Sequence, residues 1–248
     1  MPGMLVNFCS RNFDFTAVNT TGAEAIAGIS ADLGVPRLVH VSHINASHDS
    51  PSSFYRSKAA GEAAVRAAFP DSIIVKPSVM YGIEDRLLNS LAGESSSSSR
   101  LTQTDHHLTA WPMVWKFNKG ASTFNPVHVQ DVAQALANIT SLPTLDGQTL
   151  TLPGPISFSH KELEQLVSLF TFHPVSTMPE VPKRLALMIS RLAQRVWWPM
   201  LSPDEIERRF LSEPTTEQLA GGDWDKVGVT PAEIEDVAIA VLRRYRSG

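Results

Sequence analysis

A tyrosine and a lysine stand near each other at the start of a predicted helix, in the stretch SSFYRSKAAGEAAV, residues 52–65. A phenol and an ammonium group on one helix face can act as an acid/base pair, because the cation lowers the pKa of the phenol. A gap of four residues aligns them, since a helical turn takes about 3.6 residues. Here the residue four before Lys58 is Phe54, which has no proton to give, and Tyr55 is turned away by about 100°. The sequence therefore predicts a broken catalytic pair.

Ser42 is a second polar residue that could belong to such a site. It closes the apolar stretch RLVHVS, residues 37–42, which is typical of a strand. A hydroxyl at the end of a strand can face a bound cofactor, and His43 could line the same pocket, whereas His40 fits a structural role. Alternatively, Ser42 caps a loop and Lys58 is a solvated helix lysine. These residues alone leave both interpretations open.

The first third of the chain alternates strands with helices. Apolar residues recur with a helical period over residues 16–34, and Gly34 suits the end of that helix because glycine accepts the left-handed conformation. Ser50 followed by Pro51 predicts the start of a second helix, which runs to about Ala68. Strands are predicted at residues 4–8, 37–42 and 72–77. This β-α-β-α-β order favours a parallel sheet in an α/β fold.

The rest of the chain is predicted to be mostly helical. One further strand is expected at residues 148–152. Ser159 to Glu162 and Thr230 to Glu233 both match the capping-box pattern that begins a helix. We expect one helix that starts near residue 131, and four more over residues 159–170, 182–196, 204–210 and 231–246.

Composition and charge exclude several classes of function. The chain has 21 Lys+Arg against 25 Asp+Glu, a net charge of −4, which argues against nucleic-acid binding. No apolar run approaches the roughly 18 residues of a membrane-spanning helix. Cys9 is the only cysteine, which rules out an internal disulfide and fits a reducing compartment. The eight histidines form no metal-ligand motif, so we predict no metal site.

One predicted helix carries a separate signal. The stretch PKRLALMISRLAQRVWWPMLS, residues 182–202, holds four basic residues and no acidic one. Such a basic amphipathic helix can lie on a membrane surface or on a partner protein, and an ordinary helix packed on the core is the alternative. The candidate docking residues are the arginines of one helical face and two tryptophans at its end: Arg184, Arg191, Arg195, Trp197 and Trp198.

Three stretches carry a resemblance to a known family: VNTTGAEAIAGISADLGVPRLVHVSHINA, FYRSKAAGEAAVRAAFPDSIIVKPSVMYGIEDRLLN and PVHVQDVAQALANI. They resemble the atypical, extended short-chain dehydrogenases, which are epimerase/dehydratase-like. Within these, they are most similar to the nucleotide-binding accessory subunits of mitochondrial NADH:ubiquinone oxidoreductase (complex I). AFPDSIIVKPSVMYGIEDRLLN is the most specific part, and the endings SPDEIERRF and DWDKVGVTPAEIEDVAIAVLRRYR also resemble those subunits.

This resemblance implies a domain organisation, a cofactor and a set of site residues. It implies a partial Rossmann-like NAD(P)-binding domain over residues 1–140 and a smaller, mostly helical region over residues 141–248. NADPH is the implied cofactor. By resemblance, the cofactor-binding residues are the family's serine and lysine and the loop that faces the nicotinamide: Ser42, Lys58, Pro77 and Ser78. Phe54 departs from family members that carry a tyrosine there, which makes hydride chemistry less favourable.

The glycine-rich turn that opens this family is not found in the sequence. In the family, a strand, that turn and a helix N-terminus hold the pyrophosphate. Residues 4–8 instead resemble the fourth strand of the family sheet. We therefore expect a truncated or partial chain that lacks the first strands and the transit peptide, with one sheet edge unpaired.

Three functions compete on this basis. The first is a non-catalytic accessory subunit of complex I on the matrix side of the mitochondrial inner membrane, with other complex I subunits and the lipid surface as partners. The second is an NAD(P)-dependent epimerase, dehydratase or reductase, which would need a tyrosine at position 54 and a glycine-rich turn. The third is a nucleotide-free binding module built from the residual half-fold.

Overall fold

The computed structural model describes residues 14–97, 117–175, 180–196 and 202–246 of the 248-residue chain. Its largest sheet has three parallel strands in the order β1 (Val39–Val41), β2 (Ile73–Pro77) and β6 (Thr149–Leu152). Val41 pairs with Val75, and Val75 pairs in turn with Leu150. The predicted α/β class with a parallel sheet is confirmed.

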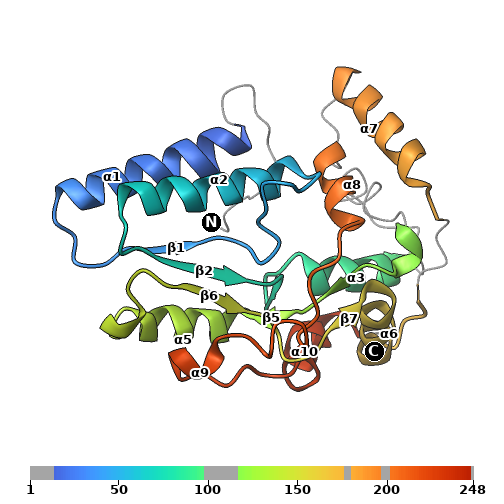
Figure 1. Cartoon of the computed structure of the whole chain (residues 1–248). Coiled ribbons are helices and arrows are strands. Elements are labelled where there is room, and N and C mark those ends of the chain that lie inside the picture. The colour runs from blue at the N-terminus through green and yellow to red at the C-terminus, as the bar shows by residue number, and fades with distance from the viewer. Residues whose placement is uncertain (1–13, 98–116, 176–179, 197–201, 247–248) are drawn as a thin grey trace.

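Successive residues of β2 face opposite sides of the sheet, and each side is covered by helices. Ile73 and Val75 pack against α5 (Val129–Ile139) and α9 (Trp224–Val227) in one apolar core. Lys76 points the other way, toward α2 (Ser53–Ala68). In Figure 1, α2 and α1 (Ala23–Asp32) lie side by side over β1, and α5 and α9 lie on the far side of the sheet.

A close contact holds α1 and α2 together. A π-helical turn, Ala17–Gly22, precedes α1 and continues into it. A Cβ added to Gly61 of α2 would stand 2.1 Å from the carbonyl oxygen of Asn19 in that turn, so only glycine permits this approach. As predicted, Gly34 follows the end of α1 in the left-handed conformation: its φ is +64°, and its N–H donates to the Ala31 carbonyl.

Two of the predicted helix starts need correction. Helix α2 is capped by Ser52, whose hydroxyl oxygen accepts from the N–H of Tyr55, and not by Ser50 with Pro51 at the first position. The capping box predicted at Thr230 does not form, because α10 starts later, with Glu233 at its N-cap and no side-chain cap. The box of Ser159 and Glu162 is confirmed at the start of α6.

The C-terminal part is mostly helical, as predicted, and builds a second apolar core. That core lies between α3 (Leu87–Ser97), α6 (His160–Thr171) and α10 (Ile234–Leu242). The two remaining strand pairs are β3 (Met80–Tyr81) with β5 (Val127–His128), and β4 (Thr123–Phe124) with β7 (Phe158–Ser159). The other helices are α7 (Lys183–Val196), α8 (Pro203–Arg209) and three short 3₁₀ turns, Asn118–Gly120, Pro143–Leu145 and Arg243–Tyr245.

Strand β6 lies beyond residue 140, so the sheet draws its third strand from the region predicted to be separate. The division at residue 140 stays a prediction. Among the described residues β1 pairs only with β2 and therefore forms an edge, and the strand predicted at residues 4–8 lies outside them. Helix α1 and the turn before it expose large apolar side chains: Val18, Ile26, Ile29 and Leu33.

Candidate functional site

Three of the four residues predicted to contact a cofactor, Ser42, Pro77 and Ser78, lie at the carboxyl ends of two neighbouring strands. Ser42 follows β1, and its N–H donates to the Val75 carbonyl of β2 at 2.8 Å. Pro77 ends β2, and Ser78 follows it. Lys58 reaches the carboxyl end of β1 from α2, because its ammonium group donates to the Val41 carbonyl at 3.3 Å. The structure thus brings the predicted serine and lysine to adjacent positions.

Phe54, not Tyr55, shares the helix face of Lys58. The Lys58 ammonium nitrogen lies 5.9 Å from the centre of the Phe54 ring. Tyr55 is buried on another face, with its ring centre 4.9 Å from that of His43. Burial raises the pKa of Tyr55 to about 12, so its phenol stays neutral at physiological pH. The tyrosine is therefore not placed to exchange protons beside Lys58.

The hydroxyl of Ser42 is bound by a carboxylate that the sequence analysis missed. Ser42 donates to Glu62, and Glu62 also pairs with Lys76 at 3.2 Å. Burial lowers the pKa of Lys58, and the nearby Glu62 carboxylate partly offsets this. Glu62 stands four residues after Lys58, so helical spacing could have placed it on the same face.

Ser78 is bound in the same way by a second carboxylate, that of the buried Glu213. The Ser78 hydroxyl donates to Glu213, and the N–H of Asn125 donates to the same carboxylate oxygen at 2.9 Å. Burial raises the pKa of Glu213, and these hydrogen bonds work against that shift. The Nε2 atom of His43 lies 3.9 Å from Oε1 of Glu213. Burial, and to a smaller extent repulsion from Arg208, lowers the pKa of His43 to about 3. His43 is therefore a neutral, packed residue.

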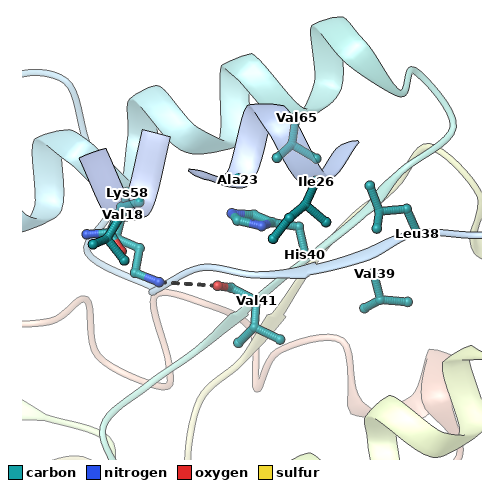
Figure 2. A pocket seen from close by; sticks show the side chains of 10 residues that line it. Val18, Ala23, Ile26, Leu38, Val39, His40, Val41, Lys58 and Val65 are labelled. Carbon is teal, nitrogen blue, oxygen red and sulfur yellow. Dashed lines mark hydrogen bonds between the residues drawn. The ribbon is translucent and has the colours of Figure 1, made fainter. Parts of the chain in front are cut away.

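A pocket of about 290 Å³ lies between α1, α2 and β1, beside Lys58. Figure 2 shows apolar side chains from all three elements around it, with His40 and Lys58 as polar members and the hydrogen bond from Lys58 to Val41 as a dashed line. The buried Nε2 atom of His40 has no hydrogen-bond partner in the described part of the chain. The volume is at the small end of the roughly 300–1,000 Å³ of ligand sites, so the pocket suits a part of a dinucleotide and not the whole.

The residues around this pocket fit the ribose end of a dinucleotide better than its diphosphate. Lys58 can donate to a sugar hydroxyl, and His40 Nε2 offers a further polar atom. The printed sequence has no glycine-rich turn that would seat a diphosphate. Within the described ranges, no group of three or more His, Cys, Asp or Glu side chains could hold a metal ion.

The predicted docking helix exposes its apolar face. The side chains of Ala186 and Ser190 face the protein, whereas large apolar side chains of α7 are exposed: Leu185, Met188, Ile189 and Leu192. Arg184 and Arg191 are exposed as well. Arg195 lies in α7, but its side chain falls outside the description, as do Trp197 and Trp198. No helix in the described ranges is long and apolar enough to span a bilayer.

Comparison with known proteins places these features in context. The chain is 34% identical over 242 residues to the mitochondrial NADH-ubiquinone oxidoreductase 40 kDa subunit of Neurospora crassa, covering 97% of this chain and 59% of that protein. It is 36% identical over 240 residues to NADH dehydrogenase (ubiquinone) 1 alpha subcomplex subunit 9, mitochondrial, of Rattus norvegicus, covering 96% of this chain and 59% of that protein. The chain thus spans less than two thirds of the length of these relatives.

Solved structures share the fold at low sequence identity. The dTDP-glucose 4,6-dehydratase DesIV of Streptomyces venezuelae, solved with NAD and TYD bound, matches with a TM-score of 0.63 at 18% identity, over 93% of this chain and 66% of that one. No protein-family profile matches the chain.

Proposed function

We infer that this chain, a homologue of the 40 kDa and alpha subcomplex 9 subunits of mitochondrial NADH:ubiquinone oxidoreductase (complex I), acts as a non-catalytic accessory subunit of that complex. The observation that carries the non-catalytic part is Phe54. It occupies the helix position beside Lys58 where acid/base chemistry would need an ionisable hydroxyl, and the phenol of Tyr55 is buried elsewhere.

The test is genetic and biochemical. Deleting the gene in the organism that encodes this chain should lower the amount of assembled complex I on a native gel, and re-expressing the chain should restore it. A normal amount of complex I in the deletion strain would refute the proposal. The tagged chain should also be recovered with other complex I subunits from mitochondria, on the matrix side of the inner membrane.

NADPH is the nucleotide we propose for the edge formed by Ser42, Lys58, Pro77 and Ser78. Lys58 supports this because its ammonium group lines the pocket and uses only one of its three donors, on the Val41 carbonyl. Titrating the protein with NADPH by fluorescence, with Lys58→Met as the matched variant, tests this. Identical titrations would exclude Lys58 from the site.

The lipid surface is the partner we propose for α7. An outward apolar face flanked by Arg184 and Arg191, in a helix without acidic residues, suits the boundary between headgroups and acyl chains of an anionic membrane. A helix that packed on the core would bury this face instead. Leu192→Glu should abolish sedimentation with vesicles that contain phosphatidylglycerol, and unchanged sedimentation would contradict the proposal.

An NAD(P)-dependent epimerase, dehydratase or reductase is the second candidate. The likeness in fold to an NAD-bound dehydratase favours it. Steady turnover coupled to NAD(P)H by the purified chain alone, with sugar nucleotides or small ketones as substrates, would establish this function in place of the first.

A further inference from the structure

A second cavity lies on the inner side of α7, where that helix meets α8 and the start of α2. Its volume is about 310 Å³. Arg56 of α2 and Arg191 of α7 both line it, from opposite elements, together with Leu187 and with Ser202 at the start of α8. Arginines from two separate helices thus line one cavity.

The carboxylates in this cavity already have partners of their own. Asp204 accepts from the hydroxyl and the N–H of Ser53 and pairs with Arg208 at 3.4 Å. Glu207 pairs with Lys183 at 2.7 Å. The two cavity arginines are not engaged by these acids, so their positive charge is left for a ligand.

The hydrogen bonds of the cavity arginines leave donors available. Arg56 donates one N–H to the Ser50 carbonyl at 2.6 Å, which leaves most of its five donors. Arg191 is exposed and forms no hydrogen bond or ion pair with any of the described residues. The Ser202 oxygen accepts from the N–H of Glu205 at 3.1 Å, which leaves the Ser202 hydroxyl proton to donate.

We propose that this cavity binds the phosphate headgroup of an anionic phospholipid, with Arg56 and Arg191 as its charged ligands and Ser202 as a further donor. Planar guanidinium groups bind phosphate oxygens in pairs. Arg191 stands four residues after Leu187, which lines the cavity, and three residues after Met188 of the exposed apolar face, so its side chain lies at the border between the two. A headgroup held here therefore keeps its acyl chains beside that face. The proposal rests on the lipid contact of α7 proposed above and names its headgroup site.

Vesicle sedimentation with matched variants tests the headgroup site. Arg56→Gln and Arg191→Gln should each weaken binding to phosphatidylcholine vesicles that contain phosphatidylglycerol by about tenfold, as for one lost charge-assisted contact. The control is Arg243→Gln, which removes an exposed arginine outside α7 that does not line the cavity, and it should change binding by less than about threefold. Equal losses for Arg243→Gln and Arg191→Gln, or no loss for Arg56→Gln, would overturn the proposal.

Further experiments distinguish a lipid headgroup from free phosphate, and failure of the headgroup site from failure of the lipid contact of α7. Millimolar inorganic phosphate should not release the protein from vesicles, and full release would show a site for free phosphate instead. If the unmodified protein binds no vesicle, the lipid contact of α7 fails and the headgroup site fails with it. If Leu192→Glu abolishes binding but Arg56→Gln and Arg191→Gln do not weaken it, only the headgroup site fails. Thermal melting of each variant checks that it folds. Arg56→Lys is a second variant at this position, because lysine can still donate to the Ser50 carbonyl while it lacks the planar guanidinium group.

Discussion

The guanidinium carbon of Arg208 lies 4.7 Å from the centre of the Phe54 ring. A cation at this distance is attracted to the face of the ring. Helix α8 therefore places a positive charge against the aromatic ring that stands beside Lys58. The same arginine pairs with Asp204, which accepts a hydrogen bond from the first N–H of α2. Arg208 is therefore held against the helix that carries Phe54.

Restoring the tyrosine should not restore an enzyme. We expect Phe54→Tyr to show no NAD(P)H-coupled turnover. The Arg208 guanidinium lies against the ring, and the Ser42 hydroxyl donates its hydrogen bond to Glu62 and not to a substrate. The measurement is the absorbance of NAD(P)H over time with a panel of carbonyl substrates. The double variant Phe54→Tyr with Arg208→Ala is the control, because it removes the contact between Arg208 and the ring. Turnover by the single variant would show that the site is intact apart from one side chain.

Gly61→Ala should destabilise the protein strongly. The added Cβ would meet the Asn19 carbonyl oxygen at 2.1 Å, so α1 and α2 must separate, which costs about 3 kcal/mol or more. Urea unfolding measures the loss. Gly28→Ala in α1 is the matched control, because its Cβ would meet no atom within 4 Å, and it should stabilise by about 0.5–1 kcal/mol. Equal effects of the two variants would contradict the tight contact at Gly61.

Asp204→Ala should weaken the attachment of α8 to the start of α2. The Asp204 carboxylate accepts the first N–H of α2 at 2.6 Å and faces the positive end of the helix dipole. We expect a loss of about 1–3 kcal/mol in the free energy of unfolding. Asp49→Ala changes an exposed carboxylate in the preceding loop and should have almost no effect. A similar loss for both would indicate a general effect of charge.

His43 should make the fold sensitive to acid. Its pKa is about 3 in the folded protein against 6.5 in the unfolded chain, because burial disfavours the charged ring. Between these values the unfolded chain binds more protons, so stability falls as the pH falls from 6.5 toward 3, by on the order of a few kcal/mol. Glu213 acts in the opposite direction, because its raised pKa lowers stability as the pH rises above 4.5. His43→Gln should flatten the acid side of a plot of unfolding free energy against pH, and an unchanged slope would contradict a neutral, buried His43.

Local spacing predicted the parts of the site that depend on one element or on neighbouring strands. The helical period separated Phe54 from Tyr55, and the end of a predicted strand pointed to Ser42, whereas Pro77 and Ser78 followed only from the family resemblance. Glu213 could not be found this way. It lies 135 residues from Ser78, in an irregular segment with no periodic signal, and only the tertiary fold joins the two.

Long-range contacts also explain the two helix starts that were predicted wrongly. Three serines compete near the start of α2, and the carboxylate of Asp204 selects among them by binding Ser52 and Ser53. At the start of α10, the N–H of Ala232 donates to Asp131 at 2.8 Å, which ties this segment to α5 in place of a local capping box. The amphipathic period of α7 was visible in the sequence, but which face turns outward depends on what the helix packs against.

The position of β6 has a consequence for biosynthesis. β2 ends at Pro77, yet its second neighbour is completed only at Leu152, so the ribosome must release some seventy further residues before the middle strand is flanked on both sides. Until then a strand with buried, apolar side chains has an unpaired side, which makes this nascent intermediate prone to aggregation.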